Sequence, residues 1–142
     1  MMKNMNDDTE KARDILIKNG YTCVLRRENV EFHSSLRGVK PLIDFLESKR
    51  DFRGFSAADK TVGLGAAHLY LLLGVRSVWA RIISQGAKEI LEKNGVEVSF
   101  EEEVPYIINR RGDGRCPIEA AVNGIACPSE ALRVIKETLS RL

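Results

Sequence analysis

The sequence has few of the residues and segments that define several large classes of protein. It contains only three cysteines, an odd number at irregular spacing, which argues against a disulfide framework and for a reducing compartment. The longest apolar stretch, residues 62–75, is interrupted by His68 and is too short to cross a bilayer. Residues 1–9 are polar and lack the apolar segment of a signal peptide. These absences favour a cytoplasmic protein with no membrane partner.

Strong charge, aromatic content and metal-ligand spacings are also scarce. The formal net charge is +2 and aromatic residues make up 6% of the chain, which leaves little attraction and few stacking platforms for a nucleic acid. The two histidines, His33 and His68, stand alone, and no Cys-x-x-Cys or His-x-x-x-His spacing occurs. Nucleic acid is therefore disfavoured as a partner, and neither a metal nor another cofactor is expected.

What remains is a balanced globular composition over 142 residues, with 44% apolar and 30% charged residues. This length suits one domain with its own core. We expect a flexible N-terminal tail at residues 1–6 and a single domain at residues 7–142.

Helix and strand patterns alternate along that domain. Predicted strands lie at residues 21–26, 30–34, 75–83, 96–100 and 104–108. Predicted helices begin at Asp7, Pro41, Ser56, Ala87, Pro117 and Pro128. The first two strands predict a β-hairpin, and the β–α–β unit at residues 75–100 predicts parallel strands. The pattern therefore indicates an α/β fold, with helices on both faces of a mixed sheet.

The first candidate site lies at the start of the long apolar helix predicted over residues 56–73. Ser56 and Asp59 have the spacing of a capping box, in which both side chains bind free backbone N–H groups of the first turn. The same position suits an anion or a carbonyl group of a ligand, with Lys60 as a cation and Asp59 as an acid or base. Both interpretations stay open, because a capping residue can also face a ligand.

The second candidate site is a basic, glycine-rich loop. Its ligand-binding candidates are Asn109, Arg110, Arg111, Gly112, Gly114 and Arg115. Glycines allow tight turns, and arginine side chains bind phosphate or carboxylate through two parallel hydrogen bonds. The alternative is a solvated basic loop without a ligand.

A cysteine follows this loop at the predicted N-cap of the next helix. The helix end and the nearby arginines would favour the thiolate of Cys116, which makes it a candidate nucleophile. The alternative is an inert thiol. The pattern Cys-Pro-x-Glu at Cys116–Glu119 recurs at Cys127–Glu130 without a preceding arginine loop, so Cys127 serves as an internal control.

Several motifs together resemble a known family. They are Gly38–Leu42, Gly54–Lys60, Ile107–Arg110 and Gly112-x-Gly114-x-Cys116-Pro117. In this order they resemble DUF1893, an uncharacterised prokaryotic family of the cytidine deaminase-like fold, over about residues 8–142. The resemblance implies a three-layer α/β/α sandwich with a mixed five-stranded sheet.

The resemblance does not extend to the zinc ligands of deaminases. Those enzymes need His-x-Glu at the start of one helix and Pro-Cys-x-x-Cys at the start of the next. The helix predicted from Ser56 begins without histidine, and the next one begins near Ser84 without cysteine. Zinc-dependent deamination is therefore not expected. The deaminase pocket lies at these helix N-termini, and the resemblance thus implies a ligand site there.

The leading hypothesis is a zinc-free deaminase-like domain that binds a small anionic, nucleotide-like ligand. The arginines of the 109–115 loop would hold its phosphate or carboxylate, beside Ser56, while Asp59 and Lys60 face it. Cys116 would act as the nucleophile if the protein is a transferase or hydrolase. The alternative is a non-catalytic sensor or protein-interaction module with a degenerate deaminase fold. The sequence also leaves a homo-oligomer open.

Overall fold

The computed structural model describes residues 6–109, 112 and 114–142. Its strands are β1 (Cys23–Arg27), β2 (Val30–Ser34), β3 (Ser56–Val62), β4 (Ser77–Ser84) and β5 (Glu97–Val104). Its helices are α1 (Asp7–Asn19), α2 (Lys40–Glu47), α3 (Leu64–Leu73), α4 (Gln85–Lys93), α5 (Pro117–Val122) and α6 (Pro128–Ser140). None of the helices in these ranges combines the length and the apolar character needed to cross a membrane.

The five strands form one sheet in the order β2-β1-β3-β4-β5. Strand β1 runs antiparallel to both β2 and β3, whereas β3, β4 and β5 are parallel to one another. The predicted hairpin and the predicted β–α–β unit account for this mixture. The mixed five-stranded sheet is therefore confirmed.

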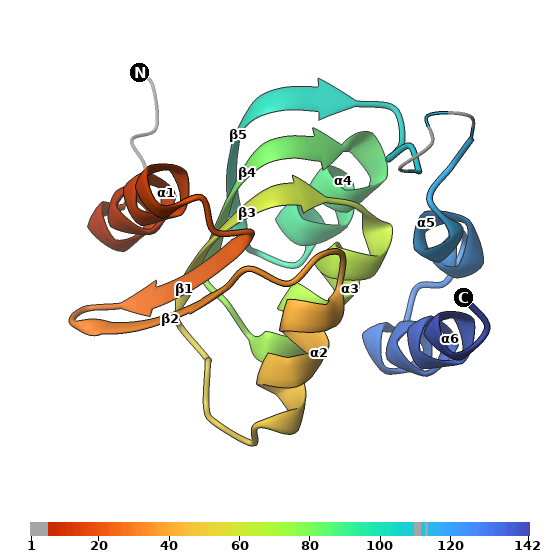
Figure 1. Cartoon of the computed structure of the whole chain (residues 1–142), viewed down its shortest axis with the longest axis horizontal. Helices are drawn as coiled ribbons and strands as arrows, with labels where there is room; N and C mark the ends of the chain where they lie inside the picture. Colours follow the sequence, from red (N-terminus) through yellow and green to blue (C-terminus); the bar gives the residue numbers. More distant parts are fainter. Residues whose placement is uncertain (1–5, 110–111, 113) are drawn as a thin grey trace.

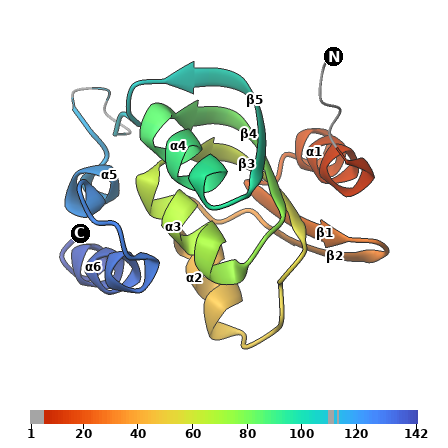
Figure 2. The ribbon, with the colours of Figure 1, turned by 180° about the vertical axis from the view of Figure 1, so that it is seen from behind.

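Helices cover the two faces of this sheet unequally. Helix α1 packs on one face, against β1 and β3, where Leu16 meets Val24, Ala58 and Trp79. Helices α2, α3 and α4 lie on the opposite face over the main core, and α5 and α6 pack against α3 (Figures 1 and 2). The predicted sandwich of helices, sheet and helices is thus found, with α5 and α6 added outside the larger layer.

The long helix predicted over residues 56–73 is wrong in its first third. Residues 56–62 form β3, and α3 begins only at Leu64, after Gly63. Helices pack on both faces of β3, so Ala57 and Ala58 are both completely buried. A strand buried on both faces shows no alternation of polar and apolar residues, and its sequence resembles that of a buried helix.

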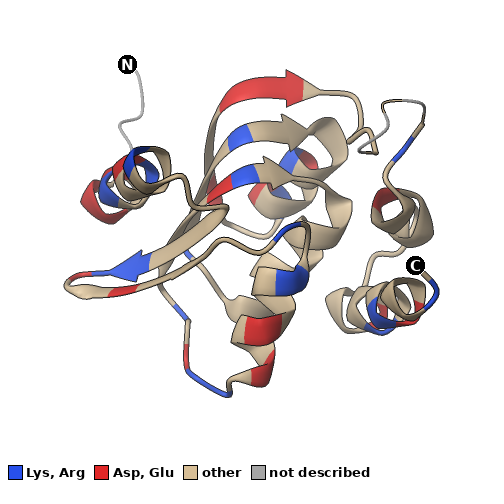
Figure 3. Ribbon diagram, in the orientation of Figure 1, with Lys and Arg blue, Asp and Glu red and all other residues tan. Residues whose placement is uncertain are grey.

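The strand predicted over residues 104–108 is also wrong. Strand β5 continues to Val104, directly after the three acidic residues Glu101, Glu102 and Glu103. Beyond it, Ile108 forms one isolated bridge with Arg115. Acidic residues have low strand propensity, but β5 is an edge strand, its acidic segment is coloured red in Figure 3, and Glu101, Glu102 and Glu103 are exposed.

A chain of buried hydroxyl groups ties α1 to the beginning of β3 and β4. The Ser77 hydroxyl donates to Ser56 Oγ at 2.8 Å and lies 2.6 Å from Thr9 Oγ1. Ser56 in turn donates to Asn6 Oδ1 at 3.2 Å, and Asn6 is the N-cap of α1. Ser56 is therefore a buried structural residue rather than the capping residue of a helix.

Candidate functional site

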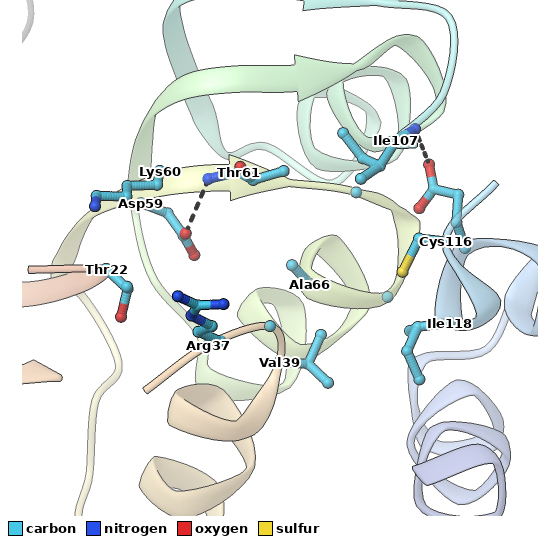
Figure 4. A pocket seen from close by; sticks show the side chains of 14 residues that line it. Thr22, Arg37, Val39, Asp59, Lys60, Thr61, Ala66, Ile107, Cys116 and Ile118 are labelled. Atoms are coloured by element: carbon cyan, nitrogen blue, oxygen red, sulfur yellow. Dashed lines mark hydrogen bonds between the residues drawn. The ribbon is translucent and has the colours of Figure 1, made fainter. Parts of the chain in front are cut away.

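A cavity of about 300 Å³ lies beside β3, the segment that precedes α2, and α5 (Figure 4). Its apolar wall includes Val39, Ala66, Ile107 and Ile118. Its polar lining residues are Thr22, Arg37, Asp59, Lys60, Thr61, Cys116 and Glu119. It therefore combines a largely apolar surface with a few polar groups, as small-molecule sites do.

Asp59 is the buried carboxyl group of this cavity. Its side chain is 8% exposed; Oδ2 accepts a hydrogen bond of 2.6 Å from the Tyr70 hydroxyl, and Oδ1 accepts one of 3.2 Å from the backbone N–H of Thr61. Burial raises the pKa of Asp59 to about 7, although these hydrogen bonds act in the opposite direction. Asp59 therefore changes its charge near neutral pH, where it can donate or accept a proton.

Two further buried groups fix the position of Asp59. Tyr70 is completely buried in α3, and its hydroxyl oxygen also lies 3.3 Å from the Cys23 sulfur. Cys23 stands opposite Asp59 in the register of β1 and β3. Burial raises the pKa of both Tyr70 and Cys23, so both remain neutral at physiological pH. Sequence reasoning missed Tyr70, which lies in an apolar helix with no local sign of its partner.

Lys60 does not share the orientation of Asp59. Because side chains alternate along a strand, Ala57 and Asp59 face the larger helical layer, whereas Ala58 faces α1. Lys60 follows Asp59, and its side chain points away from the cavity in Figure 4. It also lines a separate surface depression beside Trp79. The prediction that Asp59 and Lys60 both face a ligand from a helix N-terminus is therefore wrong, because the two residues lie on a strand and point to opposite faces of the sheet.

Arg37 supplies the guanidinium group of the cavity, and sequence reasoning missed it. It precedes Gly38, whose φ of 66° lies in the left-handed region that favours glycine, just before α2 begins. Figure 4 shows the side chains of Arg37 and Asp59 in the same half of the cavity. No hydrogen bond or ion pair joins the two within the described part of the chain. The one sequence feature that could have indicated Arg37 is the motif Gly-Val-Lys-Pro, which follows it directly.

Cys116 lies on the opposite side of the cavity from Asp59 (Figure 4). It is half-buried and is the N-cap of α5, as predicted, but its thiol makes no capping hydrogen bond. The two predicted catalytic groups thus line one cavity without direct contact in Figure 4. The predicted reactivity of Cys116 stays a prediction.

Glu119, one turn into α5, closes the N-terminus of α3. Its side chain is 4% exposed, and its carboxylate accepts hydrogen bonds from the backbone N–H groups of Leu64 at 2.6 Å and Ile107 at 3.5 Å. A Cβ atom on Gly63 would collide with this carboxylate. The helix N-terminus beside the cavity is thus already capped from within the protein, and an external anion needs another partner.

The predicted basic loop is closed by its own backbone. Asn109 N–H donates to the Gly114 carbonyl at 2.8 Å, and Gly112 N–H donates to the Asn109 carbonyl at 3.0 Å. The guanidinium of Arg115 lies 4.5 Å from the centre of the Tyr106 ring. None of these four loop residues lines the cavity.

The other two arginines of this predicted site, Arg110 and Arg111, lie outside the described residues. Their proposed contact with a ligand is therefore still a prediction from the sequence.

The residues at the two helix starts do not fit a zinc centre. Helix α3 begins at Leu64, not at Ser56 as predicted, and Gly63 and Gly65 flank that position; α4 begins at Gln85 after Ser84. No cluster of three potential ligands among His, Cys, Asp and Glu occurs in the described ranges. His68 is completely buried within α3, where burial lowers its pKa. We therefore derive no chemistry through zinc.

Fold and cavity together define an α/β domain with a mixed five-stranded sheet and a small-molecule-sized cavity. Residues 11–139 match the sequence model of a family described as TM1506, Domain of unknown function (DUF1893). The chain belongs to the DUF1893 family, as the motifs predicted.

The chain also resembles solved structures. A DUF1893 family protein (TM1506) from Thermotoga maritima has a TM-score of 0.84 and 24% identity, over 100% of this chain and 95% of that one. The apo dCMP deaminase of cyanophage S-TIM5 has a TM-score of 0.47 and 15% identity, over 70% of this chain and 100% of that one. The first likeness shows the fold. A comparison with curated proteins finds no match.

Proposed function

We propose that this protein binds a small molecule with an anionic group in the cavity between β3 and α5. The observation that carries the proposal is that one cavity of about 300 Å³ has both the Arg37 guanidinium and the buried Asp59 carboxyl group in its lining. That volume lies at the lower end of the range of small-molecule sites, roughly 300 to 1,000 Å³. The ligand is therefore a metabolite-sized molecule rather than a polymer.

Arg37 is the anchor for the anionic group. A guanidinium group can hold a carboxylate or a phosphate through two parallel hydrogen bonds. The α3 N-terminus is unsuited to this role, because the Glu119 carboxylate already accepts the Leu64 N–H group. Arg115 is engaged with Tyr106 and does not line the cavity.

Cys116 carries the second candidate function, a transferase or hydrolase reaction through a covalent intermediate. Its position on the cavity wall favours this candidate, because a thiol there would meet the bound ligand. Within the described residues, however, the Cys116 sulfur has no hydrogen bond to a base that would activate it. This favours the non-catalytic, ligand-sensing alternative, and we rank binding above catalysis.

The test is calorimetric titration with orthophosphate and with short carboxylates from acetate to valerate. The wild-type protein is compared with Arg37→Ala and with the double variant Arg110→Ala/Arg111→Ala. Arg81→Ala is the matched control, because Arg81 is an exposed arginine of β4 that pairs with Glu101 and does not line the cavity. We expect Arg37→Ala to weaken binding at least about tenfold, as the loss of a charge-assisted bidentate contact implies.

The other outcomes are equally informative. If only the double variant binds the anions more weakly, the anion site lies in the basic loop and not at Arg37. Equal binding by all variants, or no binding by the wild type, would contradict the assignment of the cavity to an anionic ligand.

A further inference from the structure

Two groups of opposite charge face the same cavity without neutralising each other. The Arg37 guanidinium is exposed at its rim, whereas the Asp59 carboxyl group is buried in its wall. Within the described residues, no hydrogen bond or ion pair joins them, and no other cation lies within ion-pair distance of Asp59. An anionic ligand would satisfy Arg37 alone and leave Asp59 without a counter-charge.

We propose that the ligand is a small zwitterion, whose anionic end binds Arg37 and whose ammonium or amidinium end binds Asp59. This inference rests on the proposed function, because it adds a second charged group to the ligand already assigned to the cavity. It narrows the ligand class from small anions to compounds such as amino acids and amidino acids.

Asp59 has the hydrogen-bonding capacity for such a group. Asp59 accepts hydrogen bonds from the Tyr70 hydroxyl and the Thr61 backbone N–H group, and the backbone N–H group of Lys60 also lowers its pKa. An ionised carboxylate has about four acceptor positions, so roughly one remains for a ligand. Because these partners donate, they hold the carboxylate in place and do not replace a cation. A ligand ammonium or amidinium group offers the missing donors together with the missing positive charge.

The groups around Asp59 allow the sign of the pH dependence to be worked out. Tyr70 of α3 and Cys23 of β1 stay neutral because burial raises their pKa values, and Arg37 stays charged. Cys116 and Glu119 of α5 lie across the cavity. Asp59, with a pKa of about 7 in the free protein, is therefore the group in contact with the ligand's cationic end that titrates near neutrality.

Opposite ligands then give opposite pH trends. A zwitterion requires ionised Asp59, whose fraction rises from about one tenth at pH 6 to about nine tenths at pH 8, so its affinity rises about tenfold. A simple carboxylate is repelled by ionised Asp59, so its affinity falls by up to about tenfold over the same range.

The experiment is calorimetric titration at pH 6 and pH 8 with matched probes. The probes are glycine, β-alanine, 4-aminobutyrate and 5-aminovalerate, each paired with the carboxylate that lacks the amine. Since the series varies the distance between the charges, it also measures the separation of the two binding groups. We expect at least one amino acid to bind about tenfold more tightly than its carboxylate at pH 8.

Variants assign the effect to Asp59. Asp59→Asn keeps the shape of the side chain but not its charge, and it should remove both the preference for the amine and the pH trend. Asp44→Asn is the matched control, because Asp44 is an exposed carboxylate of α2 that pairs with Lys40 and does not line the cavity. It should retain both.

The outcomes separate this inference from the proposed function. Binding of carboxylates that depends on Arg37, with no gain from the amine and an affinity that falls with pH, overturns the zwitterion and leaves the anion site intact. No binding of either series overturns both. An amine preference that survives in Asp59→Asn overturns the assignment to Asp59.

Discussion

Two helices of this protein begin with the same sequence pattern, Cys-Pro-x-Glu, and the protein uses them differently. Helix α5 begins after Cys116 and α6 after Cys127, and neither thiol makes a capping hydrogen bond. Glu119 of α5 is buried and bonds to the start of α3. Glu130 of α6 is 56% exposed and pairs, among the residues that the structure describes, with Arg133 at 3.8 Å. Both helices have proline in the first turn, which suits its fixed φ and explains the shared Cys-Pro start, and tertiary contacts explain the difference.

The difference between Glu119 and Glu130 shows why α5, and not α6, forms a wall of the cavity. Helix α5 is fixed to α3 through Glu119, which places Cys116 and Ile118 beside the cavity opposite Asp59. Cys127 is exposed and lines no cavity described above. One glutamate in a buried position thus converts a common helix start into part of a candidate site.

The largest expected effect concerns Asp59, the buried carboxyl group across the cavity from the start of α5. Its pKa is about 7 in the folded protein and 3.8 in the unfolded chain, so the folded state holds the proton more tightly. This contribution to stability is fully present below pH 4 and is lost as the pH rises to about 7. The loss corresponds to about 4 kcal/mol.

Unfolding by urea at pH 4.5 and pH 8 measures this effect. The Asp59→Asn variant should lose less stability than the wild type over that range, whereas Asp44→Asn on the exposed surface of α2 should follow the wild type. Parallel curves for the wild type and Asp59→Asn would show that burial of Asp59 does not control the pH dependence.

A second, smaller effect compares the two glutamates directly. Glu119→Ala removes two hydrogen bonds to a buried charge and leaves the Leu64 N–H group without its partner, so it should lower the free energy of unfolding by about 3 kcal/mol. Glu130→Ala removes one exposed ion pair and should cost less than about 0.5 kcal/mol. Chemical denaturation of both variants at pH 7 gives the difference.

A substitution at Gly63 tests the contact between α5 and the start of α3 from the other side. Gly63→Ala alone should be destabilising because the new Cβ meets the Glu119 carboxylate, and it should cost less when Glu119→Ala is already present. Gly114→Ala is the control, because the nearest atom to its Cβ is 3.8 Å away. Additive costs for Gly63→Ala and Glu119→Ala would mean that the two residues do not meet.

The smallest effect concerns the two cysteines at these helix starts. In native protein, iodoacetamide should label Cys116 and the exposed Cys127, and Cys23 should react only after unfolding, because it is 2% exposed. A saturating ligand of the cavity should slow labelling of Cys116 at least about threefold and leave Cys127 unchanged. Mass spectrometry of tryptic peptides resolves the three sites. Labelling of Cys116 no faster than Cys127 without ligand would remove the main support for a nucleophile.

Sequence reasoning predicted the fold better than the site. The hairpin, the β–α–β unit and the N-cap positions of Cys116 and Cys127 were all predictable, because turn residues and periodic patterns act over a few neighbouring residues. Residues 56–62 were predicted as helix, because a strand covered on both faces loses its alternation. That one error placed Asp59 and Lys60 on a helix turn instead of on opposite faces of a strand.

The sequence by itself determined the class of fold, the family and the presence of groups able to bind an anion. Only the tertiary structure decided which groups meet. Arg37, Asp59 and Cys116 come from three separate elements and line one cavity. Tyr70 holds Asp59 in place from α3, and Glu119 caps α3 from α5. The physical reason is that periodicity and capping depend on neighbouring residues, whereas burial, which raises the pKa of Asp59, depends on segments distant in the chain that pack together.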